Sequence, residues 1–136
     1  MNESEQTLSI IKPDAVERNL QDEIKNEFNK NGFVISKEKK INISKQEAEQ
    51  FYKVHETKPF YNDLCEYLSS GPIIVMSLQK ENAVLDNRKL MGATNPKDAE
   101  KGTLREKYGI SIDKNSVHGS DSIENAKIEI DFFFKD

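Results

Sequence analysis

The 136-residue chain has one cysteine and two histidines, and no apolar run approaches the length of a membrane span. A single thiol, Cys65, excludes an internal disulfide and a zinc site built on cysteines. A helix that crosses a bilayer needs about 20 apolar residues, so no membrane segment is predicted. The first residues, MNESEQT, are polar and acidic, unlike a secretory signal. These absences together favour the reducing cytoplasm.

A basic surplus is also missing, because 20 lysines and arginines stand against 24 acidic residues, for a net charge of -4. Proteins dedicated to nucleic acid usually carry positive charge, so nucleic acid is not expected as the main partner. The charge is uneven, however, since the stretch from Arg88 to Arg105 holds five basic residues and two acidic ones. This local excess predicts a small polyanion, although Lys89, Lys97 and Lys101 could equally be solvated surface.

The sequence contains no P-loop motif (G-x-x-x-x-G-K-[S/T]), no internal repeat and no low-complexity linker. If a nucleotide binds, its phosphates must therefore be held by side chains. The length fits a single domain over residues 1–136, with a core that needs neither disulfides nor metals.

Hydrophobic patterning predicts alternating strands and helices. The apolar run PIIVMSL, at 72–78, indicates a central strand covered on both faces. Residues 93–113 have weak periodicity and predict a long ordered loop. The other predicted strands are 7–12, 33–43 and 116–118, and the helices begin at Pro13, Leu20, Ser44, Pro59, Asn82 and Ser120 or Asp121.

Several helix ends carry recognised signals. Pro13 suits the first position of a helix, and Ser44 with Glu47 forms a capping-box pattern. Asp121 with Glu124 suggests a similar start for the last helix. One face of that helix is predicted to be buried and to consist of Ile123, Ala126, Ile130 and Phe133.

Without its extra helices, the element order is βαββαβ followed by a final helix. This order predicts an α/β (α+β) fold of the ferredoxin-like kind. We expect a four-stranded antiparallel sheet with covering helices, and a long loop before the last strand.

Three basic residues lie near the ends of predicted elements: Lys12 after the first strand, Arg88 in a short helix and Arg105 in the long loop. Lysine binds phosphate as a point charge, and arginine binds it as a bidentate fork. Together they predict an anionic ligand, although Lys12 alone could be a snorkelling edge residue.

His118 could be a solvated loop residue, a metal ligand or a nucleophile. A metal site is disfavoured, because His55 is the only other imidazole and no paired ligand spacing accompanies it. A neutral imidazole can attack phosphorus when an acceptor holds its other ring nitrogen, and Glu129 is a candidate acceptor. Ser120 could support that carboxylate or the phosphate, and Gly119 would let a substrate approach closely.

Five motifs, in matching order and spacing, resemble those of nucleoside diphosphate kinases over nearly the whole chain. The resemblance implies ping-pong transfer of the γ-phosphate from a nucleoside triphosphate, typically ATP, to a nucleoside diphosphate, through a phosphohistidine at His118. It also implies maintenance of NTP and dNTP pools, Mg²⁺ that arrives with the nucleotide, and a homo-oligomer, either a hexamer or a tetramer built from dimers. The motifs are IKPDAVER at 11–18, FYKVHETKPFY at 51–61, GATNP at 92–96, GTLR at 102–105 and NSVHGSDS at 115–122.

The resemblance also implies roles for single residues. The positions that match catalytic residues of the family are His118, Lys12, Glu129, Ser120 and Tyr52. The positions that match nucleotide-binding residues are Lys12, His55, Phe60, Arg88, Thr94, Arg105 and Asn115. Without the resemblance, Phe60 would be expected in the core and Asn115 in a turn. Stacking on Phe60 would bind any base by its π face.

The chain departs from the family pattern at Asn19, where glycine is usual, at Lys101, where proline is common, and at Leu104, where isoleucine is usual. Lys101 lies in the loop that helps to build the hexamer in that family. A competing hypothesis is a non-enzymatic nucleotide-binding regulatory module on the same fold. That hypothesis leaves His118 and the three basic residues without a common purpose.

Overall fold

A computed structural model describes residues 5–112 and 114–134; Asp113, the predicted end of the long loop, lies outside the described residues. Four strands form one antiparallel sheet in the order β2-β3-β1-β4. This order is that of the ferredoxin-like fold, which confirms the predicted architecture. The strands are β1 (Glu5–Ile11), β2 (Val34–Ile41), β3 (Ile73–Lys80) and β4 (Val117–Gly119).

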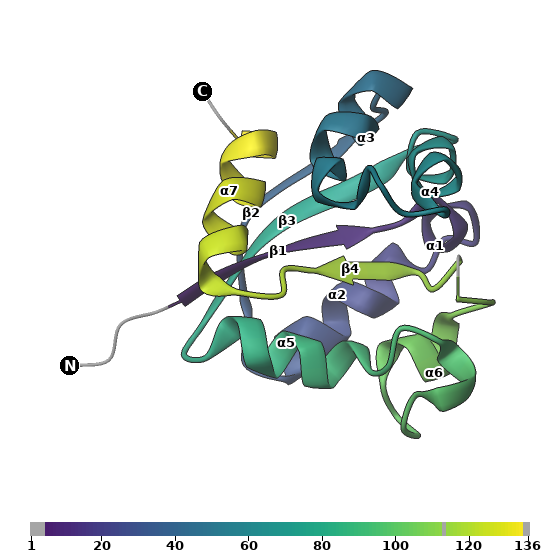
Figure 1. Cartoon of the computed structure of the whole chain (residues 1–136). Coiled ribbons are helices and arrows are strands. Elements are labelled where there is room, and N and C mark those ends of the chain that lie inside the picture. The colour runs from purple at the N-terminus through teal and green to yellow at the C-terminus, as the bar shows by residue number, and fades with distance from the viewer. Residues whose placement is uncertain (1–4, 113, 135–136) are drawn as a thin grey trace.

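Helices cover both faces of the sheet, with α2 and α5 below it and α3, α4 and α7 above it in Figure 1. No helix among residues 5–112 and 114–134 has the length and apolar character needed to cross a membrane. The helices are α1 (Pro13–Glu17), α2 (Gln21–Lys30), α3 (Lys45–Phe51), α4 (Tyr61–Leu68), α5 (Ala83–Met91), α6 (Leu104–Tyr108) and α7 (Ile123–Phe134), with 3-10 turns at Lys53–His55 and Pro96–Asp98.

The two central strands are buried on both faces, so each face of the sheet has its own core. In β1, Leu8 and Ile10 pack with the helices on one face, while Ile11 packs with α2 and α5 on the other. The short edge strand β4 follows the same alternation, because it pairs with β1 and places Val117 beside Ile11. His118, the next residue, consequently faces the side covered by α3 and α7.

The prediction of a long loop over residues 93–113 is wrong in part, because this segment contains a 3-10 turn and α6. Both elements are defined by their caps. Asn95 accepts a hydrogen bond from the backbone of Lys97 (3.1 Å), and Thr103 accepts one from Glu106 (3.4 Å). Such short helices present too few apolar positions for a periodicity to appear, although the spacing of Thr103 and Glu106 was a usable signal.

The start of α7 also differs from the prediction. Ser122, rather than Ser120 or Asp121, caps the helix, since its hydroxyl accepts a hydrogen bond from the backbone of Asn125 (3.0 Å). Asp121 instead accepts one from the Asn125 side chain (2.7 Å). The predicted buried face is correct for Ala126, Ile130 and Phe133, whereas Ile123, the first residue of the helix, is 62 % exposed.

Replacing the cap Ser122 with alanine is expected to lower the free energy of unfolding by about 1 kcal/mol, the usual cost of a lost N-cap. Asp121→Ala is the matched control and should change it by less than about 0.5 kcal/mol, because the Asp121 carboxylate accepts its hydrogen bond from an exposed side chain, that of Asn125. Urea unfolding at one fixed protein concentration measures both values. A larger loss for Asp121→Ala would place the cap at Asp121.

Candidate active site

His118 lies in the middle of β4, opposite Ile10 of β1, and its side chain is partly buried. The ring packs edge-on against Phe51 (centroids 5.3 Å apart) and Tyr52 (6.4 Å), both at the end of α3. Phe51 belongs to the motif at 51–61, but its contact with His118 was not predicted from the sequence. His118 is therefore a strand residue and not a solvated loop residue, and its ring is packed between neighbouring side chains.

One ring nitrogen of His118 is held by a carboxylate, as predicted. Nε2 lies 3.1 Å from Oε1 of Glu129, which projects from α7. The fully buried Ser120 hydroxyl donates to the same oxygen (2.8 Å) and accepts from the backbone of Leu8 (3.2 Å). An ionised carboxylate only accepts hydrogen bonds, so this arrangement favours a proton on Nε2 and a free lone pair on Nδ1.

Lys12 and Asn115 form a direct pair at the end of β1. The Lys12 side chain is only 5 % exposed, which excludes a snorkelling edge residue, and its Nζ donates to Oδ1 of Asn115 (2.9 Å). The Asn115 amide donates to the backbone oxygens of Thr94 and Ile112, each at 3.1 Å. The bond to Ile112 is local turn chemistry, whereas the bond to Lys12 joins segments far apart in the sequence.

The Arg105 guanidinium is buried on α6 and bridges two segments. It donates to the backbone oxygens of Gly92 (3.0 Å) and Val117 (2.9 Å), so it reaches the residue before His118. Its Nε is buried and makes no hydrogen bond among the described residues. Burial, together with the nearby positive charge of Arg88, lowers the pKa of Arg105 to about 10.

Arg88 is exposed on α5, and its one hydrogen bond within the described residues is a long one, 3.5 Å, to the backbone oxygen of Asp121. Within residues 5–112 and 114–134, neither Arg88 nor Arg105 forms an ion pair with a carboxylate. Two neighbouring guanidinium groups without a carboxylate repel each other, and an anion between them would relieve that repulsion. Both arginines border a hollow of about 730 Å³.

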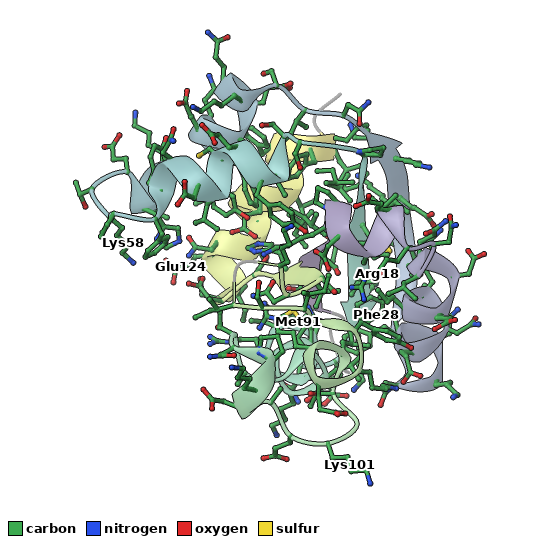
Figure 2. All side chains as sticks on the ribbon, turned by 90° about the vertical axis from the view of Figure 1, so that its right-hand side faces the viewer. Arg18, Phe28, Lys58, Met91, Lys101 and Glu124 are labelled. Atoms are coloured by element: carbon green, nitrogen blue, oxygen red, sulfur yellow. The ribbon has the colours of Figure 1, made fainter. Side chains whose placement is uncertain are left out.

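Thr94 borders the same hollow, between α5 and α6, and its side chain is exposed. Its backbone oxygen accepts the hydrogen bond from Asn115 described above, so a residue that lines the hollow is bonded to the pair of Lys12 and Asn115. Lys101, in the same basic stretch, stands at the far end of the loop before α6 and points to solvent (Figure 2). The solvated-surface alternative is therefore correct for Lys101.

A line of rings leads away from His118. Tyr52 lies next to it, His55 follows at 6.2 Å from Tyr52, and Phe60 follows at 6.1 Å from His55. Burial, and then the charge of Glu129, raise the pKa of Tyr52, so its phenol stays protonated. Burial, and then Lys58, lower the pKa of His55, which favours the neutral imidazole.

Phe60 is 44 % exposed, so the alternative of core packing is wrong for this residue. Its ring contacts His55 on one side, and the Lys58 ammonium lies 5.7 Å from its centroid. An aromatic face that remains open to solvent can stack on a flat ligand.

The prediction that Gly119 lets a substrate approach closely is wrong. A Cβ atom here would meet Asn87 Nδ2 at 2.4 Å and the Met91 methyl at 2.7 Å. Both neighbours belong to α5, which covers the face of the sheet opposite His118. Gly119 therefore allows α5 to pack closely on β4.

In the described part of the chain, no group of three or more histidine, cysteine or acidic side chains could hold a metal ion. Asn19, where the family resemblance leads one to expect glycine, has a φ of 59°. Asparagine tolerates this left-handed conformation better than most residues, so the turn after α1 keeps its shape.

Comparison with known proteins gives a consistent result. A family model described as nucleoside diphosphate kinase matches residues 5–136. A nucleoside diphosphate kinase of Campylobacter jejuni is 58% identical over 131 residues, which cover 96% of each chain. One from Wolinella succinogenes is 56% identical over 130 residues, covering 96% of this chain and 95% of that protein.

Solved structures agree with these sequence matches. A crystal form of the Aquifex aeolicus nucleoside diphosphate kinase superposes with a TM-score of 0.95 at 37% identity, covering 98% of this chain and 96% of that one. The apo enzyme from Encephalitozoon cuniculi gives 0.94 at 37% identity, with 97% and 90% covered.

Proposed function

Because the chain belongs to the nucleoside diphosphate kinase family and transfers phosphate between nucleotides, we propose that His118 carries the phosphoryl group between donor and acceptor. The contact of His118 Nε2 with Glu129, at 3.1 Å, is the observation that supports this role most directly. A regulatory module would need no oriented imidazole, so the non-enzymatic alternative is not favoured.

In the proposed first step, the Nδ1 lone pair of His118 attacks the γ-phosphorus of a nucleoside triphosphate. A bond forms between Nδ1 and phosphorus as the bond from phosphorus to the β–γ bridging oxygen breaks, and a nucleoside diphosphate leaves. The proton stays on Nε2, where Glu129 stabilises the positive charge that the ring gains. A second nucleoside diphosphate then attacks the phosphohistidine, and the same bonds change in reverse.

The cationic side chains around His118 would stabilise the anionic transition state. Lys12, Arg88 and Arg105 can supply about three positive charges, and phosphoryl transfer depends mainly on such positioning and charge. Arg105 is held next to the histidine by its bond to Val117, and the hollow beside it can receive phosphates. Asn115 and Thr94 would complete this binding region, and Tyr52 and His55 would border the phosphates.

Mg²⁺ is expected to enter with the nucleotide as part of the substrate, since this ion usually binds together with substrate phosphates. The cationic character of Arg88 and Arg105 fits the phosphates rather than the bare ion. ATP is expected as the usual donor.

We also expect a homo-oligomer, either a hexamer or a tetramer built from dimers, in the cytoplasm. Sedimentation distinguishes the two assemblies.

Phe60 is proposed as the platform for the base. Phe60→Ala should raise the KM for nucleotides by roughly 5- to 150-fold, since stacking contributes about 1–3 kcal/mol per base. The kcat and the free energy of unfolding should change little, because the ring is exposed and the rings of Tyr52 and His55 lie between it and His118. Steady-state kinetics with several bases check this, and Phe60→Tyr, which keeps the ring, is the control. An unchanged KM in the alanine variant would remove Phe60 from the binding site.

The proposed function is tested by incubating the protein with a γ-labelled triphosphate and no acceptor. The label should appear on the protein, be acid-labile and alkali-stable, map to His118 by mass spectrometry, and leave when an unlabelled diphosphate is added. Absence of label, or label on another residue that also chases into product, would overturn the proposal.

A further inference from the structure

A buried carboxylate lies two residues beyond Lys12, and the transfer chemistry described above does not use it. Asp14, in α1, is 4 % exposed, and its oxygens accept hydrogen bonds from Tyr67 of α4, from Arg18 (3.0 Å) and from Ser116 (2.7 Å). Burial raises the pKa of Tyr67, and the hydrogen bond and charge of Asp14 raise it further. Asp14 therefore joins α1 and α4 to the segment that leads into β4.

Ser116 is the partner that links this carboxylate to the site. It is fully buried and has a φ of 74°, a left-handed conformation that is strained for a residue with a side chain. Its hydroxyl has one proton, and both Asp14 and the backbone oxygen of Tyr108 (3.0 Å) lie within reach. The carboxylate is closer and charged, so it is the better acceptor.

Two bonded pairs therefore run in parallel between the start of α1 and the start of β4. Lys12 binds the side chain of Asn115, and its backbone N–H donates to the backbone oxygen of Ser116 (2.8 Å). Asp14, two residues after Lys12, binds Ser116, the residue after Asn115. Arg18, labelled beside α1 in Figure 2, adds a bond to the Ser116 hydroxyl (3.2 Å).

We infer that Asp14 and Ser116 form a positioning pair for the phosphoryl transfer, because their bond holds residue 116 in its left-handed conformation. That conformation turns the Asn115 side chain toward Lys12 and aligns β4, so the pair fixes the Lys12 ammonium and His118 relative to each other. The inference rests on the proposed function, since it assumes that Lys12 and His118 act on one phosphate. A displacement of about 1 Å in such groups can slow a reaction by roughly 100-fold.

The test compares two variants, each of which removes one hydroxyl group that donates a hydrogen bond to Asp14. Ser116→Ala should slow phosphorylation of the protein, measured in a single turnover at saturating ATP, by roughly 10- to 100-fold. Tyr67→Phe should stay within about twofold of the unaltered protein. The Tyr67 hydroxyl donates to the Asp14 carboxylate and accepts from the Asp14 backbone N–H (2.8 Å), but it does so from α4 and not from β4. Both variants should lose similar stability in urea, so lost stability alone would affect both rates equally. Equal rates in the two variants, per folded molecule, would overturn the inference.

Ser116→Gly provides a rescue, since glycine adopts a φ of 74° without strain. Its transfer rate should lie between those of Ser116→Ala and the unaltered protein, and a rate below that of the alanine variant would contradict the conformational explanation. If Ser116→Ala does not fold, Ser116→Gly is compared with Tyr67→Phe, and equal rates again overturn the inference. The unaltered protein separates the two proposals, because its failure to take label at His118 would refute the proposed function itself.

Discussion

His118→Ala is expected to lower kcat by at least about 10⁴-fold, because it removes the nucleophile on which both half-reactions depend. The labelled intermediate should vanish completely, since His118 is the only imidazole among the described residues that forms a hydrogen bond with Glu129. The free energy of unfolding should change little. The ring is only partly buried, and the bond that it gives up leaves Glu129 with its partner Ser120.

His55→Ala is the matched control, as it removes the only other imidazole of the chain. This variant should still take the label, although its KM for nucleotides can rise because His55 lies between Tyr52 and Phe60. Label in His118→Ala, or its absence in His55→Ala with the fold intact, would contradict the assignment of the two histidines. Circular dichroism and urea unfolding establish that both variants are folded.

The elements predicted well from the sequence are those whose apolar pattern is set by the core. The run at 72–78 became the doubly covered β3, and the capping box of Ser44 and Glu47 is present at the start of α3. Periodicity fails where capping decides the structure, as at Thr103 and Ser122. The prediction for Gly119 was wrong for a different reason, because a sequence does not reveal which neighbour a missing side chain makes room for.

In the candidate site too, some features were predictable from the sequence and others were not. Motif spacing predicted which groups react with a phosphate, and the structure places His118 against Glu129 and Lys12 against Asn115. The supporting contacts were not predictable, because Asp14 and Ser116 are 102 positions apart and their motifs do not indicate that the two side chains meet. Only the fold brings such residues together, and the same holds for Phe51 beside His118.

Arg105→Ala is expected to lower kcat by roughly 10³-fold, in the range found when an arginine that stabilises a phosphoryl-transfer transition state is lost. The side chain reaches the backbone of Val117, next to His118, and its guanidinium has an unused buried Nε. Lost hydrogen bonds to Gly92 and Val117 should reduce stability by about 1–3 kcal/mol. Part of that loss is offset, since burial and Arg88 already oppose the charge, as the lowered pKa of Arg105 indicates.

Lys101→Ala is the matched control, because it removes one positive charge from the same basic stretch at an exposed position. Its kcat should stay within about twofold of the unaltered protein, as expected for an exposed side chain outside the site. Arg105→Lys should recover part of the lost rate, since it keeps the charge but loses the bidentate fork.

Nucleotide binding should raise the melting temperature of the unaltered protein more than that of Arg105→Ala, because a bound anion relieves the repulsion between Arg88 and Arg105. If Arg105→Ala is unfolded, or is as active as Lys101→Ala, Arg105 supports the fold and takes no part in the transfer.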